Sequence, residues 1–570
     1  MKKTQPTHTV YNMKSLYDGV VKEAERYGDK ARYIYIDKAT KEECTITYNE
    51  MLERVNSIAA AETALGFAGE PVVITGDSNP YYVVTYLSTV ACGGISVPLD
   101  KDISVEAFCG FTEMCEAKAI VYTASLHKKI MEAKDSLPFI KYFICIEYAG
   151  DDFPDDPRFM RYEDFLAAGR KAHDEGVRTA EEHVADVDKT CAIIFTSGTT
   201  GTSKGVMLSE RNLVTSTIDC CSIMKVDVND FYVSVLPFHH TYEFTISQLA
   251  LPNTGGTTFI NDSIKNTLRS FAKYKPTMLI LVPLYVETMH KRIWAEIAKK
   301  GKTNQVKAAI KLSNGLKKVG IDVRRKLFKD ILAAFGGELH GIVCGGAPLR
   351  AELVEDFDAF GINICEGYGI TECSPLISAN PVHWKKLHSC GLVVNHMQVR
   401  IDKADPSDET GEIVAKGDAV MKGYYKNPEA SAEAFTEDGW FRTGDIGYLD
   451  EDNFVFITGR KKNVIILSNG KNVFPEELEE YLGESKYISE CVVLGRKAED
   501  GDEVAIWAIV YPNYDEFEGK SKEEIEETIK GEIDKVNKKL PIFKHIPNFE
   551  IRETEFEKTT SKKIMRYKVK

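Results

Sequence analysis

The 570-residue chain lacks several patterns that would assign it to a class at once. Its thirteen cysteines include no C-x-x-C pair and no Cys/His spacing typical of a metal site. Because the count is odd and a chain of this size needs no disulfide staples, we expect reduced thiols and a cytoplasmic setting. The first eight residues contain no apolar core of the kind that a secretion signal has.

An excess of basic charge is lacking as well. The net charge is −14 and the isoelectric point is about 5.5, which argues against general nucleic-acid binding. One uncharged run, residues 78–99, is long enough to cross a bilayer, but it contains two prolines, adjacent glycines and many hydroxyl groups. We therefore expect a buried helix followed by a strand at residues 95–99.

The length predicts at least two domains, because one hydrophobic core rarely serves so many residues. In the first third, apolar strands near residues 72, 95 and 119 alternate with helical stretches, a pattern typical of a parallel sheet with crossover helices. Residues 150–185 are acidic, and we expect an irregular surface segment there. This third provides scaffold, and the chemistry must come from later segments.

A polar loop follows the apolar residues 191–195, which predict a buried strand. From Thr196 to Gly205 the chain contains only Thr, Ser, Gly and Lys204. Backbone N–H groups, hydroxyls and one ammonium suit a polyphosphate. The P-loop pattern of kinases is absent, since glycines stand at 198 and 201 and the lysine at 204. A plain linker is the alternative, but linkers rarely lie between two buried strands.

The loop resembles the signature of the adenylate-forming (ANL) superfamily of acyl-CoA synthetases, luciferases and peptide-synthetase adenylation domains. The resemblance covers essentially the whole chain, with six motifs in family order. It implies an α/β fold with a large multi-sheet N-terminal adenylation domain, residues 1–461, and a small mobile C-terminal α/β domain, residues 462–570. It also implies ATP, Mg²⁺ and CoA as cofactor or co-substrates.

Two glycine turns follow apolar strands, where α/β sheets bind ligands. Gly345 and Gly346 allow a flat base to approach the backbone, and Tyr368 is placed to stack on it. In the resembled family these turns hold adenine, and Thr371 and Glu372 match the residues near the α-phosphate and Mg²⁺. One carboxylate plus ATP phosphates is enough for this metal. The alternative for Glu372 is a surface carboxylate that caps a helix.

Later motifs complete the nucleotide set. Asp445 suits both ribose hydroxyls, and the fork of Arg460 suits ribose or phosphate; alone, either is a generic turn residue. The whole expected nucleotide-binding set is Thr196, Ser197, Gly198, Thr199, Thr200, Gly201, Lys204, Gly345, Gly346, Ala347, Glu366, Gly367, Tyr368, Gly369, Thr371, Asp445, Arg460 and Lys563. The expected catalytic residues are Lys204, Thr371, Glu372 and Lys563.

The resemblance assigns three roles in the last hundred residues. Lys462 holds the hinge position, Gly470 lies in the loop that lines the pantetheine tunnel, and Lys563 reaches the acyl carboxylate and α-phosphate. Family members have glycine where this chain has Lys562. A solvated basic tail is the alternative reading of this end.

Two further segments indicate the acyl substrate. His240 and Glu243 match residues of the long-chain acyl-CoA synthetases and suggest a wall of the acyl pocket; a satisfied core histidine is the alternative. Residues 286–340 are expected to be helical and Lys-rich, with a solvated charged face. Their length also resembles the long-chain branch.

We therefore expect a long-chain fatty acid–CoA ligase that forms acyl-AMP and then the thioester. The alternatives are an adenylating enzyme that loads an acyl-carrier protein, and a catalytically weak protein that binds nucleotide and lipid. We expect no nucleic-acid partner and no transmembrane segment. Peripheral contact with a membrane stays open.

Overall fold

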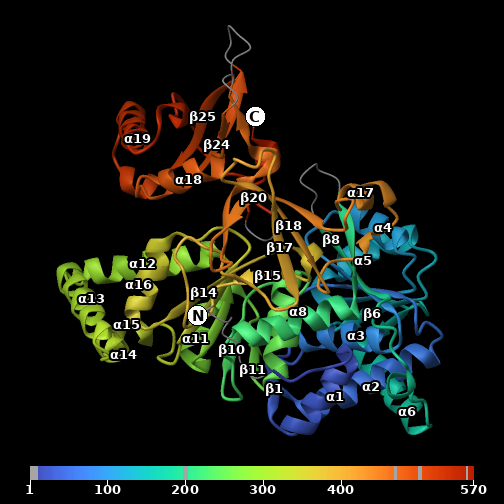
Figure 1. The fold of residues 1–570 in the computed structure, drawn as a ribbon. Helices are drawn as coiled ribbons and strands as arrows, with labels where there is room; N and C mark the ends of the chain where they lie inside the picture. The colour runs from blue at the N-terminus through green and yellow to red at the C-terminus, as the bar shows by residue number, and fades with distance from the viewer. Residues whose placement is uncertain (1–9, 197–202, 468–470, 498–503, 560–562, 570) are drawn as a thin grey trace. The chain divides into compact units, whose positions relative to one another are not determined.

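The computed structural model describes residues 10–196, 203–467, 471–497, 504–559 and 563–569. These residues form two compact units. Unit 1 holds the described residues up to 398 together with 416–435, and unit 2 holds 399–415 and the described residues from 436 onward. Figure 1 labels the elements of both.

The first sheet of unit 1 has eight strands in the order β19-β9-β8-β4-β3-β5-β6-β7. Its middle strands are parallel, as the alternating pattern predicts. Their bounds are β3 Pro71–Thr75, β4 Ile95–Leu99, β5 Ala119–Thr123, β6 Tyr142–Ile146, β7 Phe159–Arg161, β8 Thr190–Thr196, β9 Lys204–Ser209 and β19 Gly423–Tyr424. The run 78–99 forms a buried helix and strand β4, as expected.

The second sheet of unit 1 has nine strands in the order β16-β15-β14-β13-β12-β10-β11-β1-β2. Its five central strands are parallel, and their apolar residues belong to one core cluster with the covering helices. The bounds are β1 Ala31–Ile36, β2 Glu43–Thr47, β10 Phe231–Ser234, β11 Thr257–Ile260, β12 Met278–Leu281, β13 Gly341–Gly345, β14 Asn363–Gly369, β15 Leu376–Ala379 and β16 Leu392–Val393.

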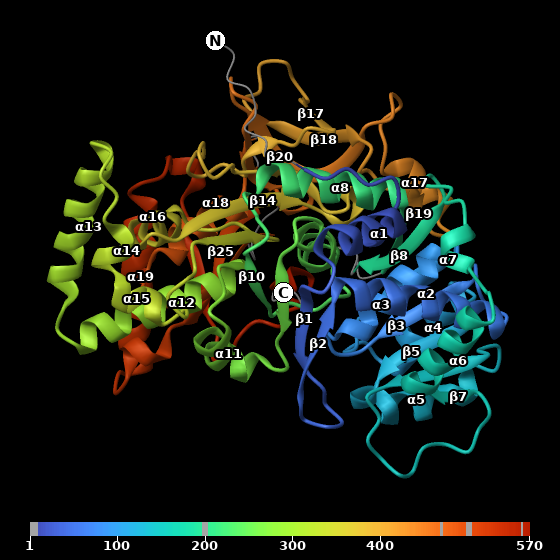
Figure 2. The same ribbon diagram turned by 90° about the horizontal axis from the view of Figure 1, so that it is seen from below.

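Helices cover both sheets of unit 1, as the two views of Figures 1 and 2 show. Their bounds are α1 Leu16–Tyr27, α2 Tyr48–Ala64, α3 Pro80–Ala91, α4 Val105–Met114, α5 His127–Ala133, α6 Tyr162–Asp174, α7 Thr179–Glu182, α8 Glu210–Ile223, α9 Thr241–Glu243, α10 Leu251–Asn253, α11 Thr267–Tyr274, α12 Pro283–Lys299, α13 Thr303–Lys318, α14 Arg324–Leu327, α15 Lys329–Ala333, α16 Ala351–Phe360 and α17 Pro428–Glu433. A π-helical turn, Phe244–Ala250, joins α9 to α10.

The expectation of an irregular segment at 150–185 is wrong. Helix α6 lies there and packs closely on α2, since a Cβ at Gly169 would lie 2.0 Å from the Ser57 carbonyl oxygen. Tyr162, Phe165 and Leu166 are buried. Their spacing of three and four residues is that of a helix face, and the acidic residues between them obscured it.

Unit 2 contains a four-stranded sheet in the order β17-β18-β20-β21 and a three-stranded sheet in the order β24-β25-β26. The bounds are β17 Met397–Asp402, β18 Gly411–Gly417, β20 Phe441–Leu449, β21 Val455–Arg460, β22 Ile465–Ile466, β23 Asn472–Val473, α18 Pro475–Gly483, β24 Ile488–Lys497, β25 Val504–Pro512, α19 Lys522–Asn537 and β26 Asn548–Ile551. The predicted capping box at Ser521 and Glu524 is present, and the apolar face of α19 is buried.

Unit 2 is larger than the C-terminal domain that the sequence predicts from residue 462. It also includes residues 399–415 and 436–461, which contain most of the four-stranded sheet. The boundary between residues 461 and 462 stays a prediction. Within the described ranges, no helix has the length and apolarity needed to cross a membrane.

Candidate functional site

The polar loop begins and ends on two paired strands. β8 and β9 run antiparallel, and Thr196 pairs with Lys204 across them. The hydroxyl of Thr196 donates to the Lys204 carbonyl oxygen at 3.5 Å. Ser197, Gly198, Thr199, Thr200 and Gly201 lie outside the described residues. The two ends of the loop are thus held side by side.

Lys204, Tyr424 and Glu372 form one cluster, although 220 positions separate the first two in sequence. β19 pairs with β9 and brings Tyr424 beside Lys204, whose ammonium lies 4.8 Å from the ring centre. The Tyr424 hydroxyl donates to Oε1 of Glu372 at 2.9 Å. Burial, and then the nearby carboxylate, raise the pKa of Tyr424, so the hydroxyl keeps its proton.

Backbone and side-chain contacts position the turn Thr371–Cys373, which follows β14. The carbonyl oxygen of Glu372 accepts a hydrogen bond from the Met421 N–H at 2.8 Å. The hydroxyl of Thr241 donates to the Thr371 hydroxyl at 3.3 Å. Glu372 is half-buried, and its second oxygen has no hydrogen-bond donor among the described residues. It therefore remains available to a ligand.

The two glycine turns lie next to each other. β13 and β14 are parallel, with Gly345 opposite Gly367, so both turns follow the carboxyl ends of neighbouring strands. Gly346 has φ +88°, which favours glycine, and the nearest atom to a Cβ there would be 3.8 Å away. A Cβ at Gly369 would lie 1.8 Å from the Pro375 carbonyl oxygen, so only glycine fits.

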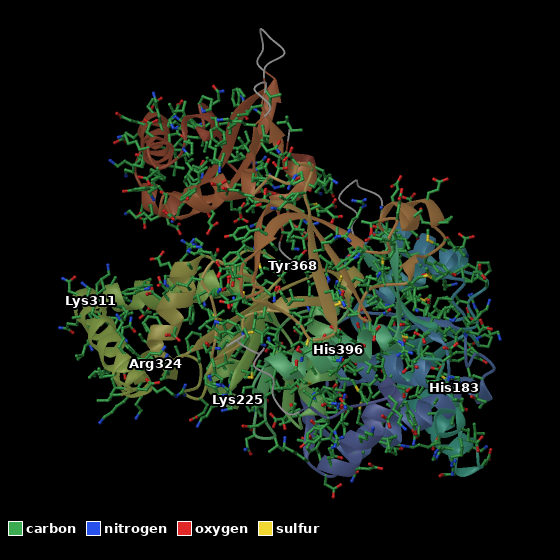
Figure 3. All side chains as sticks on the ribbon, in the orientation of Figure 1. His183, Lys225, Lys311, Arg324, Tyr368 and His396 are labelled. Carbon is green, nitrogen blue, oxygen red and sulfur yellow. The ribbon has the colours of Figure 1, made fainter. Side chains whose placement is uncertain are left out.

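The remaining residues of the turns differ in exposure. Ala347 is exposed beside Gly346, and Glu366 is half-buried. Tyr368, labelled in Figure 3, is buried with 7% of its surface exposed. The expected adenine-binding residues therefore share one edge of the sheet, and stacking by Tyr368 stays a prediction.

Glu243 is sealed in the core, with 0% exposure. Its carboxylate accepts hydrogen bonds from the hydroxyls of Tyr232 at 3.0 Å, Ser234 at 2.7 Å and Ser247 at 2.8 Å. Burial raises the pKa of Glu243 to about 7. His240 is half-buried, and its ring lies 4.1 Å from that of His239. Their part in an acyl pocket stays a prediction.

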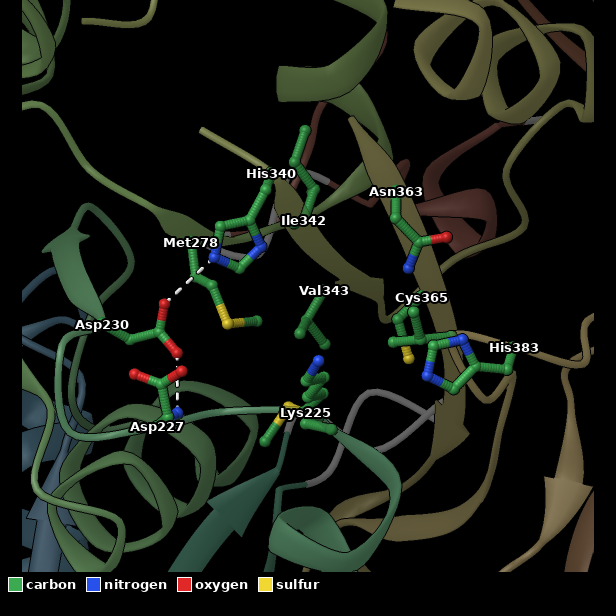
Figure 4. A pocket seen from close by; sticks show the side chains of 13 residues that line it. Lys225, Asp227, Asp230, Met278, His340, Ile342, Val343, Asn363, Cys365 and His383 are labelled. Carbon is green, nitrogen blue, oxygen red and sulfur yellow. Dashed lines mark hydrogen bonds and ion pairs between the residues drawn. The ribbon is translucent and has the colours of Figure 1, made fainter. Parts of the chain in front are cut away.

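A cavity of about 350 Å³ lies at the opposite edge of the sheet. Met278, Gly341 and Asn363, the first residues of β12, β13 and β14, line it. Figure 4 shows Lys225 pointing into it and the ion pair of His340 with Asp230, which measures 3.1 Å.

A second, apolar gap of about 10 Å³ lies close to this cavity. It shares Met224, Met278 and Val343 with the cavity and reaches Tyr232 and Ile246. Tyr232, which lines the gap, donates a hydrogen bond to Glu243 of the expected acyl-pocket segment.

Within unit 2, Asp445 and Arg460 stand opposite each other on β20 and β21. Nε of Arg460 lies 2.6 Å from Oδ1 of Asp445, which is buried. Protein packed around the Lys563 ammonium, and then the charge of Arg460, lower the pKa of Lys563, although the residue keeps an exposed surface. The structure therefore brings Lys563 within electrostatic range of Asp445 and Arg460.

Lys462 belongs to the same charged neighbourhood. Burial lowers its pKa, and the charges of Arg460 and Arg566 lower it further. Gly470 and Lys562 lie outside the described residues, and their roles stay predictions.

Sequence reasoning missed Tyr424. Its neighbours in sequence carry no recognisable motif, and its partners are distant in the chain. What marks Tyr424 as a site residue is its place on β19, which pairs with β9 next to the end of the polar loop. Only the order of strands in the sheet reveals that pairing.

Comparison with known proteins decides the family. Residues 20–425 match the family model for the AMP-binding enzyme, and residues 462–570 match that of the AMP-binding enzyme C-terminal domain. The chain belongs to the AMP-binding enzyme family. It is therefore an adenylate-forming ligase of the acyl-CoA synthetase type, and it uses ATP to activate an acyl group.

Relatives in this family differ in their acyl acceptor. The chain is 30% identical to the long-chain-fatty-acid–CoA ligase FadD15 of Mycobacterium bovis, over 79% of this chain and 75% of the relative. It is 27% identical to the long-chain-fatty-acid–[acyl-carrier-protein] ligase AEE15 of Arabidopsis thaliana, over 89% and 77%. ATP-bound MatB from Rhodopseudomonas palustris shares the fold, with a TM-score of 0.73, 22% identity and coverage of 97% and 98%.

Proposed function

We propose that this protein is a long-chain fatty acid–CoA ligase. The carboxylate of the fatty acid attacks the α-phosphorus of ATP and pyrophosphate leaves, which gives acyl-AMP. The CoA thiolate then attacks the acyl carbonyl and AMP leaves with its phosphate. The observation that carries the proposal is the Lys204–Tyr424–Glu372 cluster beside the glycine turns of an AMP-binding enzyme.

The cluster suits the phosphates of ATP. Lys204 supplies positive charge, and Tyr424 orients Glu372 by a hydrogen bond, so little reorganisation is needed when the nucleotide binds. Thr371, held by Thr241, presents a hydroxyl next to Glu372. Phosphoryl chemistry offers a protein little beyond positioning and charge neutralisation.

The donor set also fits Mg²⁺. No group of three or more His, Cys, Asp or Glu side chains suited to a metal occurs in the described parts of the chain. Mg²⁺ needs no such group, since one carboxylate, Glu372, with nucleotide phosphates and water satisfies its preference for hard oxygen ligands. When bound, the ion would neutralise phosphate charge. The acidic oxygen of Glu372 left without a donor is the place for it.

Unit 2 supplies the ribose and carboxylate contacts in this proposal. Asp445, fixed by Arg460, accepts from the ribose hydroxyls, and Lys563 donates to the acyl carboxylate and the α-phosphate. We further propose that the C-terminal domain begins at residue 462, that Lys462 is its hinge, and that Gly470 lines the path of pantetheine.

In this proposal the acyl chain enters unit 1 beside Tyr232. The small gap beside Tyr232 and Ile246 and the cavity at the amino edge share Met224, Met278 and Val343 as lining residues. Methionine adapts to irregular gaps, so Met224 and Met278 can move aside for a flexible chain. Movement of these side chains would join the two spaces, and the combined space would favour a long acyl group over a short or aromatic one.

A second candidate function differs in the molecule that accepts the acyl group from acyl-AMP. The similarity to AEE15 favours a second candidate, transfer to an acyl-carrier protein. A third candidate, a weak binder of nucleotide and lipid, rests only on Lys562.

Three assays separate these candidates. ATP–pyrophosphate exchange with fatty acids of graded length tests adenylation, and AMP release across the same panel defines the preferred acid. Product analysis with CoA or with acyl-carrier protein identifies the acceptor. Exchange and CoA thioester formation with long acids support the proposal. If no acid supports exchange, the protein does not form acyl-AMP, and the candidate that only binds nucleotide and lipid remains. If thioester forms only on the acyl-carrier protein, that protein and not CoA is the acceptor.

A further inference from the structure

The segment 299–329 of unit 1 carries a charge opposite to that of the whole chain. It contains eleven Lys and Arg residues and a single acidic residue, Asp322, in a protein of net charge −14. Such a local reversal creates a distinct electrostatic surface. The segment comprises the end of α12, all of α13 and α14, and the first residue of α15.

Helix α13 lies at the outer edge of unit 1 in both Figure 1 and Figure 2. Its inner face buries few side chains. Val306, Ala309 and Ile310 pack against the core cluster, and Ser313 is the one fully buried residue of the helix. The opposite face is exposed, and Figure 3 shows Lys311 on that outer side.

The basic side chains on this outer face are not used in ion pairs. Lys307, Lys311 and Lys318 are exposed, lie at helical spacings of four and seven residues, and have no carboxylate partner among the described residues. By contrast, Lys317 pairs with Asp358 at 2.6 Å and Arg324 with Asp322 at 2.7 Å. Lys307 also lies 5.9 Å from the ring centre of Trp294, a contact that leaves its charge unneutralised. The three lysines are therefore available to an anionic partner.

Large aliphatic side chains lie among these lysines. Leu312 is 59% exposed, Val319 72% and Ile321 52%. Leu312 and Val319, the residue that caps α13, are seven residues apart and so project in similar directions. Each directly follows a lysine of the set, so the aliphatic side chains lie about 100° round the helix axis from Lys311 and Lys318. Exposed aliphatic groups flanked by lysines form the surface of an amphipathic helix that lies in a lipid interface.

We propose that this surface, defined as Lys307, Lys311, Leu312, Lys318, Val319 and Ile321, docks unit 1 on an anionic lipid bilayer. The lysines attract anionic headgroups, and the three aliphatic side chains enter the headgroup region. The net negative charge of the remaining chain is repelled by the same bilayer, which orients the protein with this face toward the lipid.

Charge and apolarity together favour a bilayer over other anionic partners. A nucleic acid or an acidic carrier protein would use the lysines, but it gains little from exposed Leu312 and Val319. A bilayer uses both kinds of side chain. The contribution of the aliphatic pair therefore distinguishes the occupants.

Vesicle co-sedimentation of the full chain tests the proposal without any acyl substrate, so its result is independent of the proposed function. The probes are vesicles of phosphatidylcholine with phosphatidylglycerol and vesicles of phosphatidylcholine alone, at about 50 mM and about 500 mM salt. We expect binding to the anionic vesicles at low salt and its loss at high salt. Equal binding to both vesicle types would overturn the proposal.

Three matched variants complete the test. The triple change Lys307→Glu, Lys311→Glu and Lys318→Glu should weaken binding by roughly 100-fold or more, whereas Lys14→Glu, Lys128→Glu and Lys171→Glu, exposed lysines elsewhere on unit 1, should change it little. Leu312→Ser with Val319→Ser should weaken binding several-fold. Loss in both triple variants alike, or no effect of the serine pair, would overturn docking at this surface. Circular dichroism verifies that each variant is folded.

Discussion

Tyr424 joins Glu372 to Lys204, because its hydroxyl donates to Glu372 at 2.9 Å while its ring faces the Lys204 ammonium at 4.8 Å. A single aromatic side chain thus couples the end of the polar loop to the carboxylate that follows the second glycine turn. The three residues come from β9, the segment after β14, and β19. This relationship gives the first prediction.

Tyr424→Phe should lower kcat/KM for ATP by about 10- to 100-fold, because a hydrogen bond to a charged group contributes roughly 1.5–3 kcal/mol. The measurement is steady-state kinetics at varied ATP. Tyr425→Phe is the matched control, since that neighbouring tyrosine takes no part in the cluster. Equal effects of the two changes would exclude a role for the hydroxyl of Tyr424.

Lys204→Ala and Glu372→Gln should both impair adenylation, for different reasons. The first removes charge from the β/γ-phosphates, at a cost of roughly 1.5–3 kcal/mol, and should raise the apparent KM for ATP while fatty-acid binding is kept. The second removes a hard anionic ligand and should shift the Mg²⁺ dependence to higher concentration. Pyrophosphate release, titrated against ATP and against Mg²⁺, separates the two. An unshifted Mg²⁺ curve for Glu372→Gln would remove that carboxylate from the metal site.

Lys563 and Gly470 should divide the two half-reactions. Lys563→Ala should abolish acyl-AMP formation yet still convert supplied acyl-AMP and CoA to thioester. Gly470→Leu should do the reverse, because a branched side chain would obstruct pantetheine. Lys562→Gly should be tolerated, since family members have glycine there. If Lys563→Ala retains adenylation and Lys562→Gly loses it, the catalytic lysine is 562.

Glu243 should make stability depend on pH. Its pKa rises from 4.5 to about 7 on folding, so the native state binds more protons than the unfolded state between these values. The contribution of this carboxyl to stability is therefore full below about pH 4.5 and is lost as pH rises through about 7. Relative to the parent, Glu243→Gln should gain Tm between pH 5 and pH 8. A constant Tm difference across that range would contradict the assignment, and thermal unfolding measures it.

Met278→Trp should shorten the preferred acyl chain, because Met278 lines both the apolar gap and the cavity. A bulky ring there blocks the route that we propose for the distal carbons. The acyl-length panel should shift toward shorter acids, while the apparent KM for ATP stays unchanged. An unaltered length preference with intact folding would place the acyl chain elsewhere.

Local patterns in the sequence were enough for most of the elements. The capping box at Ser521, the strand and turn around Gly345, and the buried helix within residues 78–99 depend on neighbouring residues, and all are present. The family could also be predicted from the sequence, because the loops that mark it, such as residues 196–205, are short contiguous motifs. Helix α6 was missed because acidic residues, Glu163 and Asp164, interrupt the apolar residues that it buries.

Only the tertiary structure decided which distant residues meet. The order of strands in a sheet depends on the packing of the whole chain, and this order places Tyr424 on the loop of Lys204 and Glu372 beside Tyr424. The same holds for the hydroxyl cage that seals Glu243 and for the cavity at the amino ends of β12 to β14. Sequence by itself determined the chemical groups and their local turns, whereas distance and burial, which set their pKa values and their partners, came from long-range packing.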